Sequence, residues 1–195
     1  MLSTLRPALV LFGLLSLLTG LAYPALVTGV AQVLLPWQAN GSLVVGGDGQ
    51  VLGSRVVGQA FDDPRYFWSR PSATGAHPYD GASSSGSNAG PTNPALAEAI
   101  AARVEALRAA DPESTAPIPV ELVTASASGL DPDLSPAGAL YQVARVARVR
   151  HLPEADVRAL VERHVEGRTL GLLGEPRVDV LALNLALDAL ARPSS

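Results

Sequence analysis

Residues 8–30 read ALVLFGLLSLLTGLAYPALVTGV and lie within a longer stretch, residues 7–47, that carries no charged side chain. As an α-helix at 1.5 Å per residue, this run is about 34 Å long, and the hydrocarbon core of a bilayer is roughly 30 Å thick. A membrane helix tolerates a proline such as Pro24 when neighbouring groups satisfy the freed carbonyl. The sequence therefore predicts one transmembrane helix at residues 8–30.

A cleaved signal peptide is the alternative, with Arg6 as its basic region and residues 8–18 as its apolar region. No A-x-A cleavage site follows, and the apolar run continues beyond signal-peptide length. A retained anchor is therefore favoured. Arg6 is the only fixed charge near the span, and the next arginine is Arg55. The positive-inside rule then predicts a short cytoplasmic N-terminus at residues 1–7 and an extracytoplasmic domain at residues 31–195. The localisation expected is the cell (inner) membrane, in a single pass.

Composition narrows the chemistry of the 195-residue chain. Its 14 basic residues are all arginine, so no lysine can bind phosphate in a P-loop or form a Schiff base. It has no cysteine, which excludes disulfides, thiol nucleophiles and thiolate metal sites. The formal net charge of -4 argues against nucleic acid as a partner, because phosphate contact needs a basic surface.

The outer domain mixes strand and helix signals. Residues 42–45 (SLVV) and 50–52 (QVL), each with a short Val/Leu run, flank Gly46-Gly47-Asp48-Gly49, which predicts a β-hairpin. Residues 72–93, rich in Ser, Gly, Asn and Pro, predict a long loop. Residues 118–124 predict a buried strand, and residues 178–190 a short strand that runs into a final helix. The fold class expected is therefore α/β (α+β), attached to one N-terminal transmembrane helix.

Three further helices are predicted between these segments. The first follows the capping pair Asn93-Pro94 and ends near Asp111. The second opens at Ser135-Pro136, and the third covers residues 153–165. The expected inward faces are Leu96, Ile100, Val104 and Leu107 in the first helix, Leu140, Val143, Ala144 and Ala147 in the second, and Val157, Leu160, Val161 and His164 in the third.

The sequence predicts no catalytic residue and no metal ligand. The histidines at 77, 151 and 164 have no metal-ligand spacing, and His164 on its apolar stripe is typical of a packed core residue. No G-x-S-x-G elbow is present. The serines at 83–85 with His77 do not form a triad pattern, and the glycine run at 46–49 fits a turn better than a phosphate loop.

Two segments remain as candidate binding elements. Residues 126–131, SASGLD, are a candidate nucleotide or anion loop through Ser126, Ser128, Gly129 and Asp131, because successive backbone amides form anion nests. The alternative is that Asp131 closes a turn. Residues 63–72 gather aromatic and arginine side chains, the types enriched in binding hot spots, and Tyr66, Trp68 and Arg70 are candidate partner contacts. The alternative there is that the aromatics pack on the core.

Several segments are recognisable together. They are GQAF (58–61) with YFWSRPSA (66–73), SNAGPTNP (87–94), LVTAS (122–126) with SGLDP (128–132), YQ (141–142) and RVA (145–147), and VLALNLALD (180–188). In order and spacing they resemble the signatures of the C chain of the Kdp-type potassium-transporting P-type ATPase, over nearly the whole chain. Ser85 and Ala127 stand where that family has glycine, Asp133 where histidine is usual, and Asp179 where asparagine is usual.

The resemblance implies a non-catalytic accessory subunit of a high-affinity, ATP-driven potassium importer, and it adds Asn88 and Asn93 as candidate partner contacts. The implied partners are a channel-like potassium-selecting chain, a P-type ATPase chain and a small membrane chain. The chain has no cofactor of its own, and ATP is used by the partner ATPase chain. In the family view the C chain stabilises assembly and raises the ATP affinity of the catalytic chain. The alternative is a membrane-anchored extracytoplasmic binding module or hydrolase unrelated to transport.

Overall fold

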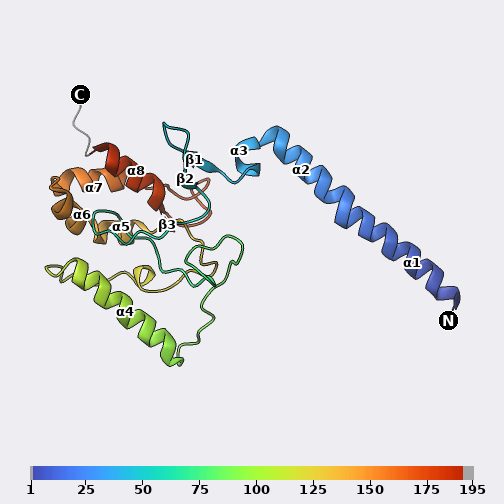
Figure 1. The fold of residues 1–195 in the computed structure, drawn as a ribbon, viewed down its shortest axis with the longest axis horizontal. Coiled ribbons are helices and arrows are strands. Elements are labelled where there is room, and N and C mark those ends of the chain that lie inside the picture. The colour runs from blue at the N-terminus through green and yellow to red at the C-terminus, as the bar shows by residue number, and fades with distance from the viewer. Residues whose placement is uncertain (1, 191–195) are drawn as a thin grey trace. The chain divides into compact units, whose positions relative to one another are not determined.

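In the computed structural model, which describes residues 2–190, the chain divides into two compact units, Met1–Val44 and Val45–Ser195 (Figure 1). The predicted outer domain at residues 31–195 therefore ends in a segment, 191–195, that lies outside the described residues. The placement of the domain outside the cytoplasm stays a prediction.

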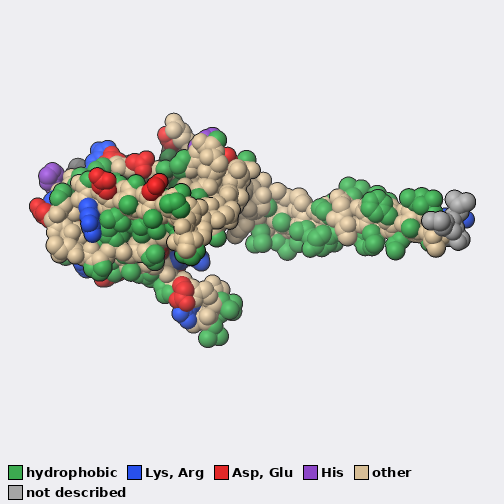
Figure 2. Space-filling view, turned by 90° about the horizontal axis from the view of Figure 1, so that it is seen from below, with side chains coloured by type: hydrophobic (Ala, Val, Ile, Leu, Met, Phe, Trp, Pro, Cys, Tyr) green, Lys and Arg blue, Asp and Glu red, His purple; other side chains and the backbone are tan. Residues whose placement is uncertain are grey.

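The first unit is dominated by one long helix. It consists of α1 (Leu2–Leu17), the π-helical turn η1 (Leu18–Ala22) and α2 (Tyr23–Leu34), followed by the short helix α3 (Pro36–Ala39). The stretch Thr4–Leu34 is long and apolar enough to cross a membrane, and none of its most apolar window is buried in the protein. Figure 2 shows apolar side chains distributed along the visible face of this helix. The predicted transmembrane helix lies wholly within it.

The π-helical turn explains how the helix accommodates Pro24. The N–H of Tyr23 bonds to the carbonyl of Leu18, five residues back, instead of the usual four. Proline has no N–H to donate, and its ring clashes with the carbonyl four residues earlier. One wider turn immediately before Pro24 makes room for the ring without breaking the helix.

The predicted hairpin turn is present between β1 (Leu43–Val45) and β2 (Val51–Ser54). The N–H of Gly46 donates to the carbonyl of Gln50 at 2.8 Å, and the Asp48 carboxylate accepts from the N–H of Gln50 at 3.1 Å. Gly49 has a φ of +82°, a conformation in which a side chain is strained. The glycine run is therefore a turn.

The helices of the second unit begin at the predicted capping residues. Asn93 accepts from the N–H of Ala95 at 3.0 Å at the start of α4, and Ser135 accepts from the N–H of Gly138 at 3.2 Å at the start of α5. The elements are α4 (Pro94–Ala110), η2 (Val120–Leu122), β3 (Asp133–Leu134), α5 (Pro136–Tyr141), α6 (Val143–Arg150), α7 (Glu154–Arg163), β4 (Val178–Asp179) and α8 (Val180–Leu190). The final strand and helix match the prediction for residues 178–190.

Two predictions about these elements were wrong. Residues 118–124 form a 3₁₀ turn at η2 instead of a buried strand, because Pro119 fixes the backbone entering it and Thr124 Oγ1 closes it by donating to the carbonyl of Val120 at 2.8 Å. The helix expected after Ser135 is interrupted at Gln142, which divides it into α5 and α6. This break rotates the buried face, so Ala144 is exposed and Val146 is buried.

The core of the second unit lies among α5, α6, α7 and α8, while α4 lies apart from this group (Figure 1). Of the predicted α4 face only Leu107 is buried, and Leu96, Ile100 and Val104 are half-buried. Strands β3 and β4 pair antiparallel, with Asp133 opposite Asp179 and Leu134 opposite Val178. Short antiparallel strands beside a helical core are typical of the α+β class. Of the two classes expected, α/β and α+β, the second unit therefore fits α+β.

Candidate functional site

Residues 63–72 begin with a turn at 63–66 and continue without regular secondary structure. This stretch, here called the extended segment, belongs to no sheet, although its centre is buried. Phe67 is 0% exposed and Trp68 is 6% exposed. Buried backbone N–H and C=O groups without partners are costly, so a segment in this position needs hydrogen bonds from elsewhere. Side-chain amides from two helices provide them.

Asn184 on α8 pairs with both backbone groups of Phe67. Its Oδ1 accepts from the N–H of Phe67 at 2.9 Å, and its Nδ2 donates to the carbonyl of Phe67 at 3.0 Å. Asn184 is 2% exposed, so water does not compete for these groups. One side chain therefore takes the place of a neighbouring strand.

Gln142, at the break between α5 and α6, does the same for the next residue. Its Oε1 accepts from the N–H of Trp68 at 2.8 Å, and its Nε2 donates to the carbonyls of Trp68 at 3.1 Å and Gly138 at 3.3 Å. Gln142 is 1% exposed, so its amide lies inside the core, at the point where α5 ends and α6 begins. The two amides together fix the register of residues 67–68 against α5, α6 and α8.

The indole of Trp68 lies between two guanidinium groups. Arg103 from α4 and Arg145 from α6 lie 5.0 Å and 4.9 Å from the ring centroid, which is cation–π geometry. The indole N–H donates to the carbonyl of Asp63 at 3.0 Å. Trp68 is thereby one link between α4 and the helical core, to which Leu107 of α4 also belongs.

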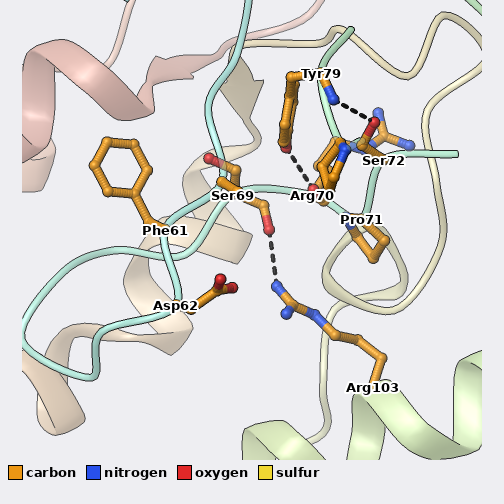
Figure 3. Close-up of a pocket in the computed structure, with 10 residues that line it drawn as sticks. Phe61, Asp62, Ser69, Arg70, Pro71, Ser72, Tyr79 and Arg103 are labelled. Carbon is orange, nitrogen blue, oxygen red and sulfur yellow. Dashed lines mark hydrogen bonds between the residues drawn. The ribbon is translucent and has the colours of Figure 1, made fainter. Parts of the chain in front are cut away.

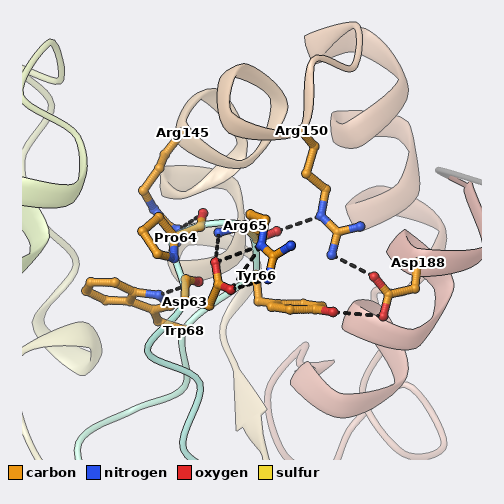
Figure 4. Close-up of polar contacts among 8 residues, drawn as sticks. All are labelled: Asp63, Pro64, Arg65, Tyr66, Trp68, Arg145, Arg150 and Asp188. Atoms are coloured by element: carbon orange, nitrogen blue, oxygen red, sulfur yellow. Dashed lines mark hydrogen bonds and ion pairs between the residues drawn. The ribbon is translucent and has the colours of Figure 1, made fainter.

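Arg145 is a charge inside this core. It donates to the carbonyl of Pro64 (Figure 4). It also donates to Gln142 Oε1 at 2.6 Å. Within residues 2–190 its guanidinium has no ion-paired carboxylate, and burial lowers the pKa of Arg145 to about 10. The side chain stays protonated at neutral pH and is held by neutral acceptors and the indole face.

A second polar contact group surrounds Tyr66 (Figure 4). Its hydroxyl donates to Asp188 at 3.1 Å, and the Arg150 guanidinium lies 4.6 Å from its ring centroid. Arg150 also pairs with Asp188 at 2.7 Å and donates to the carbonyl of Arg65 at 2.7 Å. The beginning of the extended segment is thus tied to α6 and α8 by charge-assisted bonds.

The predicted nucleotide or anion loop, residues 126–131, is a junction of polar loops. Its amides are already engaged: Gly129 N–H donates to Ser126 Oγ at 2.9 Å and Leu130 N–H to Ser128 Oγ at 3.1 Å. Asp131 accepts from the N–H of Asp133 at 3.1 Å, which is the turn-closing alternative, and also pairs with Arg70 at 2.8 Å. Anion binding by this loop stays an untested prediction that these bonds do not favour.

The same junction receives bonds from loops far away in the sequence. Gly58 N–H donates to the carbonyl of Leu130, Ser72 Oγ to that of Gly129 and Ser85 N–H to that of Ser128, at 2.9, 2.7 and 2.9 Å. Gly129 has a φ of +67°, and a Cβ there would lie 2.6 Å from the carbonyl oxygen of Ser85. Segments 58–61, 66–73 and 122–132, recognised separately in the sequence, therefore meet here in space.

A small open cavity of about 200 Å³ lies on the other side of the extended segment (Figure 3). Arg103 crosses its lower edge and donates to the carbonyl of Ser69 at 2.9 Å, and Tyr79 donates to the carbonyl of Arg70 at 2.5 Å. The cavity is lined by Ala60, Phe61, Asp62, Ser69, Arg70, Pro71, Ser72, Pro78, Tyr79 and Arg103. Arg103 and Tyr79 thus bond to backbone carbonyls here, Arg70 pairs with Asp131, and Ser69 Oγ and Arg70 Nε are buried without a hydrogen-bond partner among the described residues.

The remaining candidates are placed separately. Asn88 is exposed with a φ of +50°, and Asn93 serves as the cap of α4. His77 is exposed, and His164 is half-buried with its Nδ1 2.8 Å from the carbonyl of Leu160. No group of three or more metal-ligating side chains occurs between residues 2 and 190. The partner-contact assignments for Tyr66, Trp68, Arg70, Asn88 and Asn93 stay predictions, although Trp68 takes the core-packing alternative in this chain.

Two residues that differ from those usual in the family that the sequence resembles lie opposite each other on paired strands. Asp133 and Asp179 are directly paired in β3 and β4, where like charges repel. Arg177 lies 3.2 Å from Asp133 and Arg55 lies 3.8 Å from Asp179. Burial raises the pKa of Asp133 to about 6, and the carboxylate of Asp179 adds to this against the lowering effect of Arg177.

The raised pKa of Asp133 makes the free energy of unfolding depend on pH. Unfolded Asp133 titrates near pH 4, so between about pH 4 and 6 the folded protein binds more protons and its stability falls as pH rises. We expect Asp133→Asn to gain about 1–2 kcal/mol relative to the parent across that window, discounted for solvent screening. Urea unfolding of the full chain in mild detergent at pH 4, 5, 6 and 7 measures it. Glu105→Gln, at an exposed site, is the control, and a pH-independent difference for Asp133→Asn would contradict the assignment.

Sequence reasoning missed the residues that hold the site together. Gln142, Arg145, Asn184 and Asp188 stood inside recognised segments, but no spacing rule marked them as partners of residues 63–68. An amide or a charge within an otherwise apolar helix face was the available signal. Such residues have to find a partner when they are buried.

The comparisons with known proteins agree with one another. The family model described as "KdpC: K+-transporting ATPase, c chain" matches residues 5–189. A relative from Sorangium cellulosum is 68% identical over 96% of this chain and 98% of its own length. Relatives from Variovorax paradoxus and Methylococcus capsulatus are 64% and 62% identical, each over 97% of this chain and over 97% and 100% of their own lengths. All three are named "Potassium-transporting ATPase KdpC subunit".

Proposed function

Because this chain belongs to the KdpC family, the c chains of the K⁺-transporting ATPases, we propose that it is a non-catalytic accessory subunit that stabilises the assembled pump and assists its ATP-hydrolysing chain. The observation that carries the proposal is the architecture of the second unit. Several of its recognised segments bond to one another, at residues 67–68 and at the loop of residues 126–131. Such bonds serve to hold surface loops in a fixed arrangement.

The proposed partners are the other chains of that ATPase: a channel-like potassium-selecting chain, a P-type ATPase chain and a small membrane chain. ATP is used by the ATPase chain, and this chain has no cofactor of its own. The apolar helix Thr4–Leu34 anchors the subunit in the cell membrane. With Arg6 at its start, the N-terminus is cytoplasmic and the second unit is extracytoplasmic. Any effect on the ATP affinity of the catalytic chain is then relayed through the membrane.

The proposal is tested with the purified complex. A tag on this chain should bring down the other ATPase chains in mild detergent, and potassium-stimulated ATPase activity at limiting ATP should fall when this chain is left out. A complex that stays assembled and hydrolyses ATP with unchanged affinity in the absence of this chain would refute the accessory role.

The orientation gives a separate prediction. A reporter fused after residue 195 should behave as extracytoplasmic, because one charge, Arg6, precedes the uncharged span and none follows it closely. The measurement uses paired reporters, one active only in the cytoplasm and one active only outside it, with the same reporters fused at residue 1 as the control. Cytoplasmic activity of the C-terminal fusion would reverse the orientation and make direct contact with ATP possible.

Glycines of the anchor give a prediction about assembly. A Cβ built on Gly13, Gly20 or Gly29 meets nothing within 4 Å in this chain, so each surface is open to another helix. We expect Gly→Leu at these positions to leave the second unit folded and to weaken co-purification of the partner chains, because overpacking a close helix contact costs about 1–3 kcal/mol. Leu26→Ile, on an exposed part of the same helix, is the control. Normal assembly of all three leucine variants would show that the helix is only a tether.

A further inference from the structure

The strongest exposed apolar feature of the second unit is a loop between α7 and β4, residues 167–174, here called the leucine loop. It reads GRTLGLLG. Leu170 is 88% exposed, Leu172 80% and Leu173 63%. Single exposed leucines are ordinary, but three within four residues at the end of one loop mark an interaction surface.

The leucine loop is preformed. Thr169 and Leu173 exchange backbone bonds at 2.9 and 3.0 Å, and the N–H groups of Gly171 and Leu172 donate to the carbonyls of Arg168 and Thr169 at 2.9 and 3.2 Å. Leu170 adopts a φ of +55°, which places it at the turn. The amides of residues 169 and 171–173 are thus satisfied within the loop while its leucines point outward.

The base of the loop is also fixed. Arg168 pairs with both oxygens of Glu175 at 2.8 and 2.6 Å, and Glu166 and Arg177 exchange backbone bonds at 2.8 and 3.0 Å. Glu166 in addition pairs with Arg55, which directly follows β2. The loop is therefore held beside the segment through which the chain enters the second unit.

Residues 35–54 separate the anchor helix from Arg55. Twenty residues span no more than roughly 70 Å even when extended. If the apolar helix is in a bilayer, as the proposed function has it, this stretch tethers the second unit to the surface of that bilayer.

The chemistry of the loop favours lipid over a protein surface. Protein hot spots are enriched in Trp, Tyr and Arg and poor in leucine, whereas residues 169–174 contain no aromatic and no charged side chain. A loop at the acyl-chain boundary loses part of its hydration, and unpaired amides are costly there. In the leucine loop the amides of residues 169 and 171–173 are already bonded within the loop.

We propose that the leucine loop inserts Leu170, Leu172 and Leu173 into the acyl-chain boundary of the same bilayer that holds the N-terminal helix. The insertion gives the second unit a second attachment to the membrane. It would limit rotation of the unit about its linker and so present one face to the other chains of the pump.

The test uses the full-length chain, which has no cysteine and accepts single ones as probe sites. Leu172→Cys carries an environment-sensitive fluorophore, and the protein is reconstituted in phosphatidylethanolamine–phosphatidylglycerol vesicles. Quenching by doxyl-labelled lipid is compared with quenching by iodide. Val120→Cys, at an apolar site that is 71% exposed on the same unit, is the matched control. We expect the lipid-to-iodide quenching ratio at Leu172 to exceed that at Val120 by about tenfold, from the preference of a leucine-rich tip for hydrocarbon.

Further variants separate the outcomes. Leu170→Asn combined with Leu173→Ser should bring the ratio at Leu172 down to that of Val120, and asparagine suits the positive φ of position 170, so the loop keeps its shape.

Equal ratios at Leu172 and Val120, with a lipid-quenched probe at Val27→Cys in the anchor, would overturn the loop proposal alone. A Val27 probe open to iodide would overturn the anchoring and the loop proposal together. Shielding of Leu172 only when the other ATPase chains are present would mean that a protein covers the loop, and lipid insertion would be wrong.

Discussion

Replacing Asn184 with leucine should destabilise the second unit by about 2–5 kcal/mol, although leucine has a similar volume and is more apolar. The change leaves the N–H and the carbonyl of Phe67 buried without partners, and each orphaned group costs about 1–3 kcal/mol. Both groups now bond to Asn184, at 2.9 and 3.0 Å. Because whole domains are stable by only about 5–15 kcal/mol, this single change removes a large part of the total.

Urea unfolding of the full chain in mild detergent, followed by circular dichroism, measures this effect. Ala182→Leu, at an exposed position of the same helix, is the control and should lie within about 0.5 kcal/mol of the parent. Asn184→Asp keeps the acceptor for the N–H of Phe67 but presents an oxygen to its carbonyl, so it should also be destabilising. If Asn184→Leu were as stable as the parent, residues 63–72 would be held by apolar packing and the amide pairing would be incidental.

Trp68→Ala should cost about 3–5 kcal/mol, the range for truncating a large buried aromatic side chain. The loss includes the ring that lies between Arg103 and Arg145, so Arg145 would remain buried beside a cavity. Trp68→Phe keeps a ring there and loses chiefly the indole bond to the carbonyl of Asp63, at a cost of about 1 kcal/mol. The same urea unfolding measurement separates the two variants.

This prediction also decides how partner contacts are to be tested. A loss of assembly in Trp68→Ala would follow from unfolding and would say nothing about an interface. Asn88→Gly is the informative comparison, because glycine suits its φ of +50° and the exposed side chain is removed without strain. We expect Asn88→Gly to unfold like the parent and to co-purify less of the partner chains. Normal assembly of this variant would remove Asn88 from the candidate contacts, and a stable Trp68→Ala would contradict the core role of the indole.

The sequence by itself determined those features of the chain that depend on neighbours along it. A helix long and apolar enough to cross a bilayer follows from residues 8–30, since this property depends only on length and an apolar composition. The glycine turn at 46–49 and the caps Asn93 and Ser135 were predicted because a cap or a turn is satisfied within a few residues. Family membership also came from the sequence, through the order and spacing of segments from GQAF (58–61) to VLALNLALD (180–188).

Only the tertiary structure decided that Phe67 and Trp68, within residues 63–72, are core residues. The aromatic and arginine side chains of this segment were equally consistent with an interface and with a core, because composition does not say what lies opposite. The answer came from Gln142 and Asn184, whose amides reach Trp68 and Phe67 across 74 and 117 positions of the sequence. Local pattern carries no information about such a partner. The same limit explains why the strand predicted at 118–124 was wrong, because no strand among the described residues pairs with these apolar residues. It also explains why the helix break at Gln142 was not predicted, because the amide's partner, Trp68, lies 74 positions away.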